Sequence, residues 1–353
     1  MRARIAVLVV LALASACKRK RGDAYKMDQV AAQGAHACGA MHDGSVRCWG
    51  KSGDEVVLSP RAVDGVTNAV EVAVGDDHAC ARTKPGLVRC WGKDGHGQLG
   101  EGNTIVDAKG LAAGSAHTCV LRKDGTVQCW GKNDHGQLGD GTTDDRKAAV
   151  TVVKLGSVVA IAAAGDTTCA VLDDTTARCW GRGTEGQLGA GQTVDAHEPA
   201  VVKTLGIKSL AVGPTHVCAR LENETAQCWG HNDHGQLGDG TTEDHASPRA
   251  VLAANIVRTV SVGTRHTCAH MGDSTVHCWG ANDVHQAGLD DTKDVLSPHL
   301  VTGLYESADV AVGKDFSCVR MIDGWLRCWG TNQHGELGDG TTELRTLPNP
   351  ISY

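Results

Sequence analysis

The sequence predicts an all-β fold built from repeated units, and three observations support this prediction. The tripeptide Cys-Trp-Gly occurs seven times in the 353-residue chain, and its cysteine always follows another cysteine by ten residues. The last four copies are spaced 49 to 50 residues apart. Between the copies lie short segments rich in Val and Thr and bounded by Gly, Pro or Asp, as strands usually are. Self-similarity at this period indicates a β-propeller or a solenoid.

Each full unit is expected to contain four short strands, the last two of which form a hairpin. In the sixth repeat we expect the strands at residues 247–251, 258–262, 266–270 and 274–279. In the third repeat, pairing Cys119 with Cys129 leaves a three-residue loop that ends in Gly125, which is a favoured connection. Three middle repeats replace this glycine with Thr175, Glu224 and Ser274. Their turns must therefore differ or bear strain.

The same register places the two cysteines of each repeat directly across two antiparallel strands, where a disulfide can form. A metal site would need clustered ligands such as Cys-x-x-Cys, and this spacing does not supply them. The tryptophan follows the second cysteine and so points to the opposite face of the sheet. We expect disulfides at Cys38–Cys48, Cys80–Cys90, Cys119–Cys129, Cys169–Cys179, Cys218–Cys228, Cys268–Cys278 and Cys318–Cys328.

Several motif elements recur in fixed order, namely Gly-x-x-His-x-Cys-Ala, Asp-Gly-x-Val-x-Cys-Trp-Gly and Asn-Asp-His-Gly-Gln-Leu-Gly-Asp-Gly-Thr-Thr. This pattern resembles the regulator of chromosome condensation repeat over about residues 29–353. The resemblance implies a seven-bladed β-propeller, whose adjacent blades would cover both faces of each sheet. It also implies protein partners, because relatives bind other proteins through blade-edge loops.

Two units depart from this pattern, and the chain ends suggest how the ring closes. The first unit carries KSGDEVVL at 51–58 in place of the Gly-Gln-Leu-Gly motif. The linker after the second unit is about ten residues short, so the blade that follows residues 101–114 could lack its first strand. The first copy begins near Val30 and the chain ends in LPNPISY. We therefore expect the C-terminal strand to join the N-terminal blade and close the ring, which removes free sheet edges.

The N-terminus predicts export and a lipid anchor. Residues 1–16 combine a basic start with an apolar run that is short for a membrane span, and the segment ending in Cys17 resembles the lipobox of bacterial lipoproteins. An ordinary secretory signal cut near the same place is the alternative. Residues 17–28 would form a tether whose basic Lys18–Arg21 rest on anionic headgroups or remain solvated. We expect a propeller at residues 29–353, held in the bacterial envelope at the outer membrane, where disulfides persist.

Two histidine positions recur in the repeats. The first holds His36, His78, His117, His216 and His266, with Thr167 and Phe316 as substitutes. The second holds His96, His135, His234 and His334. A ring of imidazoles could bind metal, but a phenylalanine fits the first position, which favours packing. We expect no metal, and no cofactor either, because Gly-Gln-Leu-Gly-Asp-Gly lacks the lysine and the helix of a phosphate loop.

A functional site should be sought among residues that are not repeated. Trp325 is the best such residue, because the equivalent positions are Ser45, Leu87, Thr126, Thr176, Thr225 and Thr275. An aromatic side chain near a hairpin turn either anchors a binding partner or packs on a neighbouring loop. We identify no catalytic residues, because no nucleophile, base and acid stand apart from the repeats.

These observations predict a lipid-anchored, disulfide-stapled propeller that binds an envelope or extracellular protein as a monomer and is not an enzyme. The 41 acidic residues against 34 Lys and Arg give a net charge of −7, which disfavours nucleic-acid binding. A carbohydrate-active envelope hydrolase is the alternative, and it would need paired carboxylates. Guanine-nucleotide exchange is the activity of the eukaryotic protein after which the repeat is named. We expect it less than the other two functions, because this chain is acidic and exported.

Overall fold

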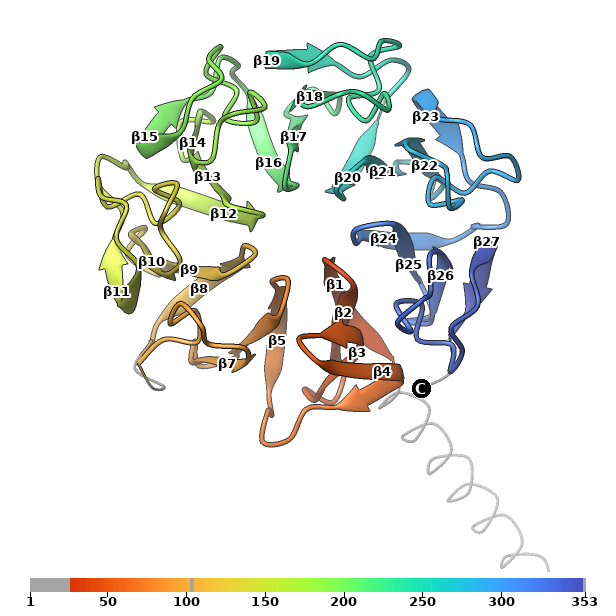
Figure 1. Ribbon diagram of the computed structural model, residues 1–353, viewed down its shortest axis with the longest axis horizontal. Coiled ribbons are helices and arrows are strands. Elements are labelled where there is room, and N and C mark those ends of the chain that lie inside the picture. Colours follow the sequence, from red (N-terminus) through yellow and green to blue (C-terminus); the bar gives the residue numbers. More distant parts are fainter. Residues whose placement is uncertain (1–25, 102–104, 255, 352–353) are drawn as a thin grey trace, which may run out of the picture.

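A computed structural model describes residues 26–101, 105–254 and 256–351, and it shows seven blades arranged in a ring around a central axis (Figure 1). The described residues form strands and no helix, and the strands make seven antiparallel sheets. We number the blades 1 to 7 along the chain. The prediction of an all-β, seven-bladed β-propeller is therefore confirmed.

The strands of each blade follow one another from the central channel outward (Figure 1). The innermost strands are β1 (Met27–Gln33), β5 (Ala69–Val74), β8 (Ala108–Ala113), β12 (Val158–Ala164), β16 (Ile207–Val212), β20 (Val257–Val262) and β24 (Ser307–Val312). The second strands are β2 (His36–Met41), β6 (His78–Thr83), β9 (His117–Arg122), β13 (Thr167–Leu172), β17 (His216–Leu221), β21 (His266–Met271) and β25 (Phe316–Met321).

The third strands carry the Cys-Trp-Gly motif. They are β3 (Val46–Ser52), β7 (Val88–Gly92), β10 (Val127–Gly131), β14 (Ala177–Gly181), β18 (Ala226–Gly230), β22 (Val276–Gly280) and β26 (Leu326–Gly330). The outermost strands are β4 (Glu55–Ala62), β11 (Arg146–Thr151), β15 (Ala196–Val201), β19 (His245–Ala250), β23 (Val295–Leu300) and β27 (Arg345–Pro350).

The hairpin between the second and third strands has the expected register. Cys119 pairs with Cys129, and the N–H of Gly125 donates to the carbonyl of Arg122 over 3.0 Å. Gly125 has a φ of 84°, and the three residues that replace glycine adopt the same left-handed region: Thr175 at 65°, Glu224 at 65° and Ser274 at 64°. The turns are therefore alike, and those three bear the strain of a side chain in this region.

All seven cysteine pairs form disulfides within single blades. At each interface between consecutive blades, which we call a junction, the disulfide of one blade packs near the tryptophan of the next. Cys119, Cys129 and Trp180, for example, belong to one buried apolar cluster between blades 3 and 4. In each blade, the tryptophan of the third strand thus packs against the preceding blade, and the disulfide packs against the following blade. The core of the protein is distributed over these junctions.

The segment that joins the third and fourth strands supplies the rest of each junction, and we call it the junction loop. It spans residues 132–145, 182–195, 231–244, 281–294 and 331–344 in blades 3 to 7, and residues 93–100 hold the equivalent motif in blade 2. A backbone carbonyl of this loop accepts a hydrogen bond from the indole Nε1 of the next blade. These bonds are Trp130 to Gln98 (2.9 Å), Trp180 to Gln137 (2.9 Å), Trp229 to Gln187 (2.8 Å), Trp279 to Gln236 (2.9 Å), Trp329 to Gln286 (3.1 Å) and Trp49 to Glu336 (2.9 Å).

The loop approaches the indole so closely that glycine is required after its leucine. A Cβ on Gly139 would lie 2.7 Å from Trp180 Nε1, and the φ of Gly139 is 67°. Both features exclude an ordinary side chain at this position. The recurring Gly-Gln-Leu-Gly is therefore a packing motif between blades.

The expected order of strands within a blade was wrong by one strand. Residues 247–251 were expected to start the sixth blade, but β19 pairs with β18 and is the outermost strand of blade 5. The junction loop turns the chain back on itself. In it, Asn232 Nδ2 donates to the carbonyls of Thr241 (3.1 Å) and Glu243 (3.0 Å), while the N–H of Leu237 donates to Asn232 Oδ1. The chain thus returns to the strand that it has just left.

The expected mode of ring closure was wrong for the same reason. The C-terminal β27 pairs with β26 in blade 7, and blade 1 is completed by its own β4. Blade 7 meets blade 1 through ordinary junction contacts. The N–H of Lys314 donates to the carbonyl of Gly34 (2.8 Å), and that of Gly340 donates to Leu58 (2.9 Å). The ring is therefore closed by packing and hydrogen bonds between two complete blades.

The incomplete blade is also not the expected one. The blade that follows residues 101–114 contains all four strands, β8 to β11, and its innermost strand is present. Blade 2 instead has three strands among the described residues, β5 to β7. The short linker falls where the outermost strand of blade 2 would lie. In addition, β1 begins at Met27, within the segment expected to be a tether.

Candidate functional site

The first set of histidines lies buried in the junctions. His117 Nε2 is 2.8 Å from Thr168 Oγ1 of the next blade, and that hydroxyl donates to the carbonyl of Gln137 (3.0 Å). The hydroxyl hydrogen is thus committed to Gln137, so the network assigns the N–H to His117 Nε2. Burial lowers the pKa of His117 to about 3, so this imidazole is neutral at pH 7. The same arrangement joins His78 to Thr118, His216 to Thr267 and His266 to Ser317.

Four of these five histidines have structural partners, each in a separate junction. Thr167 and Phe316 take the histidine position in two blades, and the position that faces them in the next blade holds Val217 and Ala37 instead of a hydroxyl residue. Neither substitute needs a hydroxyl in the next blade, because Thr167 Oγ1 donates to the Arg182 carbonyl in its own blade and Phe316 lies in the same apolar cluster as Ala37. This pattern supports the packing role that the sequence favours.

Three histidines of the second set contact carboxylates across junctions, on the face that carries the junction loops. His96, His135 and His234 each place Nδ1 2.8 Å from a carboxylate of the next blade, on Asp145, Asp195 and Asp294 respectively. His334 instead contacts Glu336 within its own loop, at 3.0 Å. These side chains are half-buried or exposed. They link neighbouring loops.

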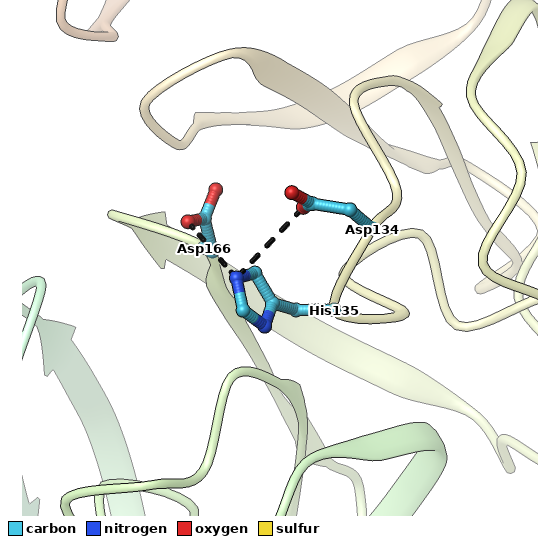
Figure 2. A group of neighbouring side chains, drawn as sticks. All are labelled: Asp134, His135 and Asp166. Carbon is cyan, nitrogen blue, oxygen red and sulfur yellow. Dashed lines mark ion pairs between the residues drawn. The ribbon is translucent and has the colours of Figure 1, made fainter.

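Two carboxylates flank His135 at the junction of blades 3 and 4, as Figure 2 shows. His135 Nε2 lies 3.9 Å from Asp134 Oδ1 and 3.9 Å from Asp166 Oδ2. The Lys132 ammonium is already 3.2 Å from Asp134 and 3.4 Å from Asp166. Gln137 Nε2 donates to the same two carboxylates, at 3.3 and 3.1 Å. The lysine thus supplies the counter-charge that a metal ion would bring, and the group is built as a charge-paired contact between blades.

A second group of this kind holds Glu185, His231 and Asp244 at the next junction. His231 Nδ1 is 3.1 Å from Asp244 and 3.8 Å from Glu185. Burial lowers the pKa of His231, but the carboxylates of Asp244, Asp233 and Glu185 outweigh this effect and raise it overall. This imidazole therefore carries more positive charge than a free histidine would. Like Lys132, it balances the carboxylates that surround it.

The central channel is lined by the innermost strands and encloses about 280 Å³. Its wall consists mainly of alanine and valine from the seven inner strands, with Gln33, Ser261, Thr264 and Lys314 as polar members. Three of the polar residues lie toward one end of the inner strands, at Gln33, Thr264 and Lys314. Such a wall supplies shape and apolar surface but no paired carboxylates.

Trp325 lies in the hairpin turn of blade 7, on the face opposite the junction loops. Its side chain is 42% exposed. Two further apolar side chains that sequence analysis did not single out line the same pocket of about 310 Å³, namely Tyr305 at 76% and Ile322 at 63% exposure. Glu306, Asp323 and Arg327 add charge to the rim. The result is an exposed apolar patch with a polar rim, which we call the blade 7 patch and define as Tyr305, Ile322 and Trp325.

Turn stability does not explain a tryptophan at this position. In blade 3 the Thr126 hydroxyl donates to Asp124 Oδ1 over 2.7 Å, and the same bond forms in blades 1, 4, 5 and 6. Trp325 keeps the backbone bond to Asp323 Oδ1 (3.0 Å) but has no hydroxyl to donate. The turn of blade 7 therefore lacks the hydroxyl hydrogen bond that stabilises five other turns, and it carries an exposed aromatic ring in place of that hydroxyl.

Neither the expected lipid anchor nor its signal can be placed, because Cys17 lies outside the described residues. The described part of the chain has no helix that could cross a membrane. The predicted boundary at residue 16 remains a prediction.

The fold and its junctions define a class, the β-propellers of seven small antiparallel sheets. Within that class the chain belongs to the RCC1-like domain family, whose profile matches residues 103–353. The regulator of chromosome condensation (RCC1) repeat matches residues 69–98 as well. The resemblance to this family is therefore confirmed. A search among curated protein sequences gave no match.

Solved structures agree with this assignment at the level of the fold. Yeast RCC1 (Prp20), solved with Kap60 bound to it, superposes with a TM-score of 0.79 at 20% identity and covers 88% of this chain and 84% of its own. A second structure of Prp20p from Saccharomyces cerevisiae, described with its binding to Gsp1p and histones, gives 0.77 at 19% identity over 95% and 89%. Human WBSCR16 gives 0.75 at 20% identity over 84% and 85%.

Proposed function

We propose that this chain is a non-catalytic protein-binding module that uses the blade 7 patch as its contact surface. The observation that carries the proposal is the exposed ring of Trp325 beside Tyr305 and Ile322, at a position where the other turns hold small or aliphatic residues. Aromatic anchors with a polar rim are typical of protein interfaces. The similar yeast propeller is described as binding Gsp1p and histones, and as bound to Kap60, so the fold supports protein contacts.

Trp325→Thr tests this function with little effect on the fold. Threonine occupies the equivalent turn position in four other blades, so the variant should fold and gain a hydroxyl bond to Asp323. Leu87→Thr is the matched control, because Leu87 is the same turn position in blade 2 and is also 42% exposed. The full chain and both variants would be used to capture proteins from envelope extract.

We expect a partner that is retained by the wild type and by Leu87→Thr but lost with Trp325→Thr. An equal set of captured proteins from all three chains would contradict a role for the patch. The alternative, a hydrolase acting on carbohydrate, would need a pair of available carboxylates. The two carboxylates near His135 are already paired with Lys132, so this site does not favour it.

We also propose that the propeller is tethered to a bacterial membrane through a lipid on Cys17, a location that rests on the sequence of the N-terminus. Such a chain should incorporate labelled palmitate and partition into detergent. Cys17→Ser should abolish both properties. Unchanged labelling of the Cys17→Ser chain would rule the anchor out.

A further inference from the structure

The junction between blades 1 and 2 differs from the other six. It contains a cleft of about 830 Å³, which is lined by β3, β4 and the end of β7. Trp91 lines this cleft and is half-buried, whereas the six equivalent tryptophans are 2% exposed or less: Trp49, Trp130, Trp180, Trp229, Trp279 and Trp329. The indole that every other junction covers is therefore open here.

Two missing pieces create the cleft. Blade 1 joins β3 to β4 through Gly53 and Asp54 alone, where blade 3 has residues 132–145, so no junction loop reaches Trp91. In four other junctions this loop also donates a backbone hydrogen bond to the outermost strand of the next blade, as when the N–H of Gly240 donates to Leu296 on β23. Blade 2 has no such strand among the described residues. Among the described residues, this junction therefore lacks both the loop and the strand that would meet it.

His36 is the buried histidine of this junction, and the residue that faces it in blade 2 has no hydroxyl group. His36 is 2% exposed and lines the cleft, and its Nε2, the atom that meets a hydroxyl in four other junctions, has no hydrogen-bond partner among the described residues. Where His117 meets Thr168, His36 meets Ala79. A buried polar group without a partner costs free energy, so an unsatisfied imidazole at a cleft points to a group that arrives from outside.

The other junctions show which chemistry fits here. In each, a turn that ends in glycine brings a backbone carbonyl to the indole Nε1, and the next side chain is aliphatic; at Trp180 these residues are Gln137 and Leu138, and Leu138 packs in the cluster of the Cys119–Cys129 disulfide. The corresponding groups in the cleft are Trp91 and Cys38–Cys48, and Cys48 is half-buried. Ion pairs between Lys93 and Asp77 and between Arg61 and Glu55 lie at the rim, so both signs of charge are present.

We propose that this cleft is a second protein-binding site, which takes a loop of a partner protein that resembles the chain's own junction loops. The partner loop would present a backbone carbonyl to Trp91 Nε1, a leucine-sized side chain to the Cys38–Cys48 disulfide, and a hydroxyl or carbonyl oxygen to the Nε2–H of His36. The inference rests on the proposed function only in that both are protein contacts, because the cleft and the blade 7 patch lie in different blades.

A synthetic probe can replace the unidentified partner. The probe is a cyclic peptide with the sequence of residues 133–141, Asn-Asp-His-Gly-Gln-Leu-Gly-Asp-Gly, and its control carries aspartate in place of the leucine. Binding to the full, disulfide-bonded chain would be measured by calorimetry and by the shift of the Trp91 indole N–H resonance. Trp91→Leu removes the donor, and Leu205→Ala, at a residue 74% exposed in another blade, is the surface control. A further variant replaces Gly53–Asp54 with residues 132–145 and so restores the missing loop.

We expect the peptide to bind the wild type and Leu205→Ala equally and to shift the Trp91 resonance. Loss of the indole donor should weaken binding by about tenfold, the effect of one buried hydrogen bond. The loop graft should abolish binding while raising the melting temperature, because it fills the cleft and covers the indole. The aspartate peptide should not bind.

Three results would overturn the proposal. The first is no binding at millimolar peptide together with a graft that does not stabilise the chain. The second is binding that persists in the graft, or that is as tight in Trp91→Leu as in the wild type, either of which places the peptide elsewhere. The third is self-association that Trp91→Leu abolishes, which would assign the cleft to a second copy of this chain instead of a foreign partner. None of these results bears on Trp325, so the proposed function is tested separately.

Discussion

Trp49 in blade 1 donates its indole N–H to the backbone carbonyl of Glu336 in blade 7, over 2.9 Å and across 287 positions of sequence. This bond is the last of the series that joins every junction loop to the next tryptophan. A Cβ on Gly338 would lie 2.8 Å from the Trp49 ring, so the loop is packed as tightly here as in the other junctions. Blade 7 is therefore joined to blade 1 by the same indole-to-loop hydrogen bond that joins the other blades which have a junction loop.

Removing this donor should loosen the closing junction. Trp49→Phe keeps an aromatic ring but leaves the Glu336 carbonyl without its donor, which should lower the free energy of unfolding by about 1–2 kcal/mol. Trp91→Phe is the matched control, because Trp91 meets no junction loop, and it should cost clearly less. Denaturant unfolding of the two variants provides the comparison. Equal losses would show that the indole bond does not stabilise the junction.

Deleting Arg345–Tyr353 should fray blade 7 far more than blade 1. β27 pairs only with β26, so its loss exposes the edge of β26 and frees the end of the junction loop at 331–344. Hydrogen exchange should accelerate in β26 and in that loop. Protection in β1 should fall much less, because β1 does not pair with β27 and shares only an apolar cluster with the deleted Ile351. If β1 and blade 7 lose protection together, the C-terminal strand closes the ring after all.

The disulfides should differ in how readily they are reduced. The cysteines of blades 3 to 7 are fully buried, but Cys48 and Cys90 are half-buried, because the cleft exposes one and the missing outer strand exposes the other. Mild reductant should therefore open Cys38–Cys48 and Cys80–Cys90 first. Alkylation after timed reduction, followed by mass mapping, gives the order. Early reduction of the bridges in blades 4 to 6 would be inconsistent with this burial.

The buried histidines should make the protein less stable in mild acid. Burial lowers the pKa of His117, His216 and His266 from 6.5 to about 3, and that of His36 and His78 to about 4. Between these values and 6.5 the unfolded chain binds more protons than the folded chain, so stability is full above pH 6.5 and falls as the pH decreases toward 3. Each histidine contributes a slope of up to about 1.4 kcal/mol per pH unit in this range.

His117→Phe isolates one of these contributions, because Phe316 already occupies the equivalent position in blade 7. Unfolding free energies measured at pH 7 and at pH 4.5 should differ less in this variant than in the wild type. An unchanged difference would mean that His117 is not buried in its neutral form.

Much of the fold follows from the sequence because one strong pattern is repeated seven times. The spacing of Cys119 and Cys129 fixes the hairpin register, and the position of Trp130 fixes which face it covers. The outermost strands were assigned to the wrong blade because segments such as β19 have no such marker. Their partner is decided by the fold of the junction loop around Asn232, which spacing alone does not reveal.

The candidate site was predictable in part. Trp325 stands out because it breaks the repeat, but Tyr305 comes from the segment before β24 and joins it only when the blade folds. Ala79 also breaks a repeated position, and the missing loop at 51–58 was visible. The sequence does not show that Ala79 and the missing loop both affect the surroundings of His36 and Trp91. To predict this, one must know that the residue after the second-strand histidine faces the preceding blade.

The central claim, that the propeller binds a protein through the blade 7 patch, is tested most directly by photo-crosslinking in cells. A photoreactive phenylalanine at Tyr305 keeps an aromatic ring in the patch, and the same residue at Leu205, the equivalent segment before β16, serves as the control. We predict a discrete adduct of higher mass from position 305 that disappears when Trp325→Thr is added, and none from position 205. No adduct at position 305, or the same adducts from both positions, would contradict the account.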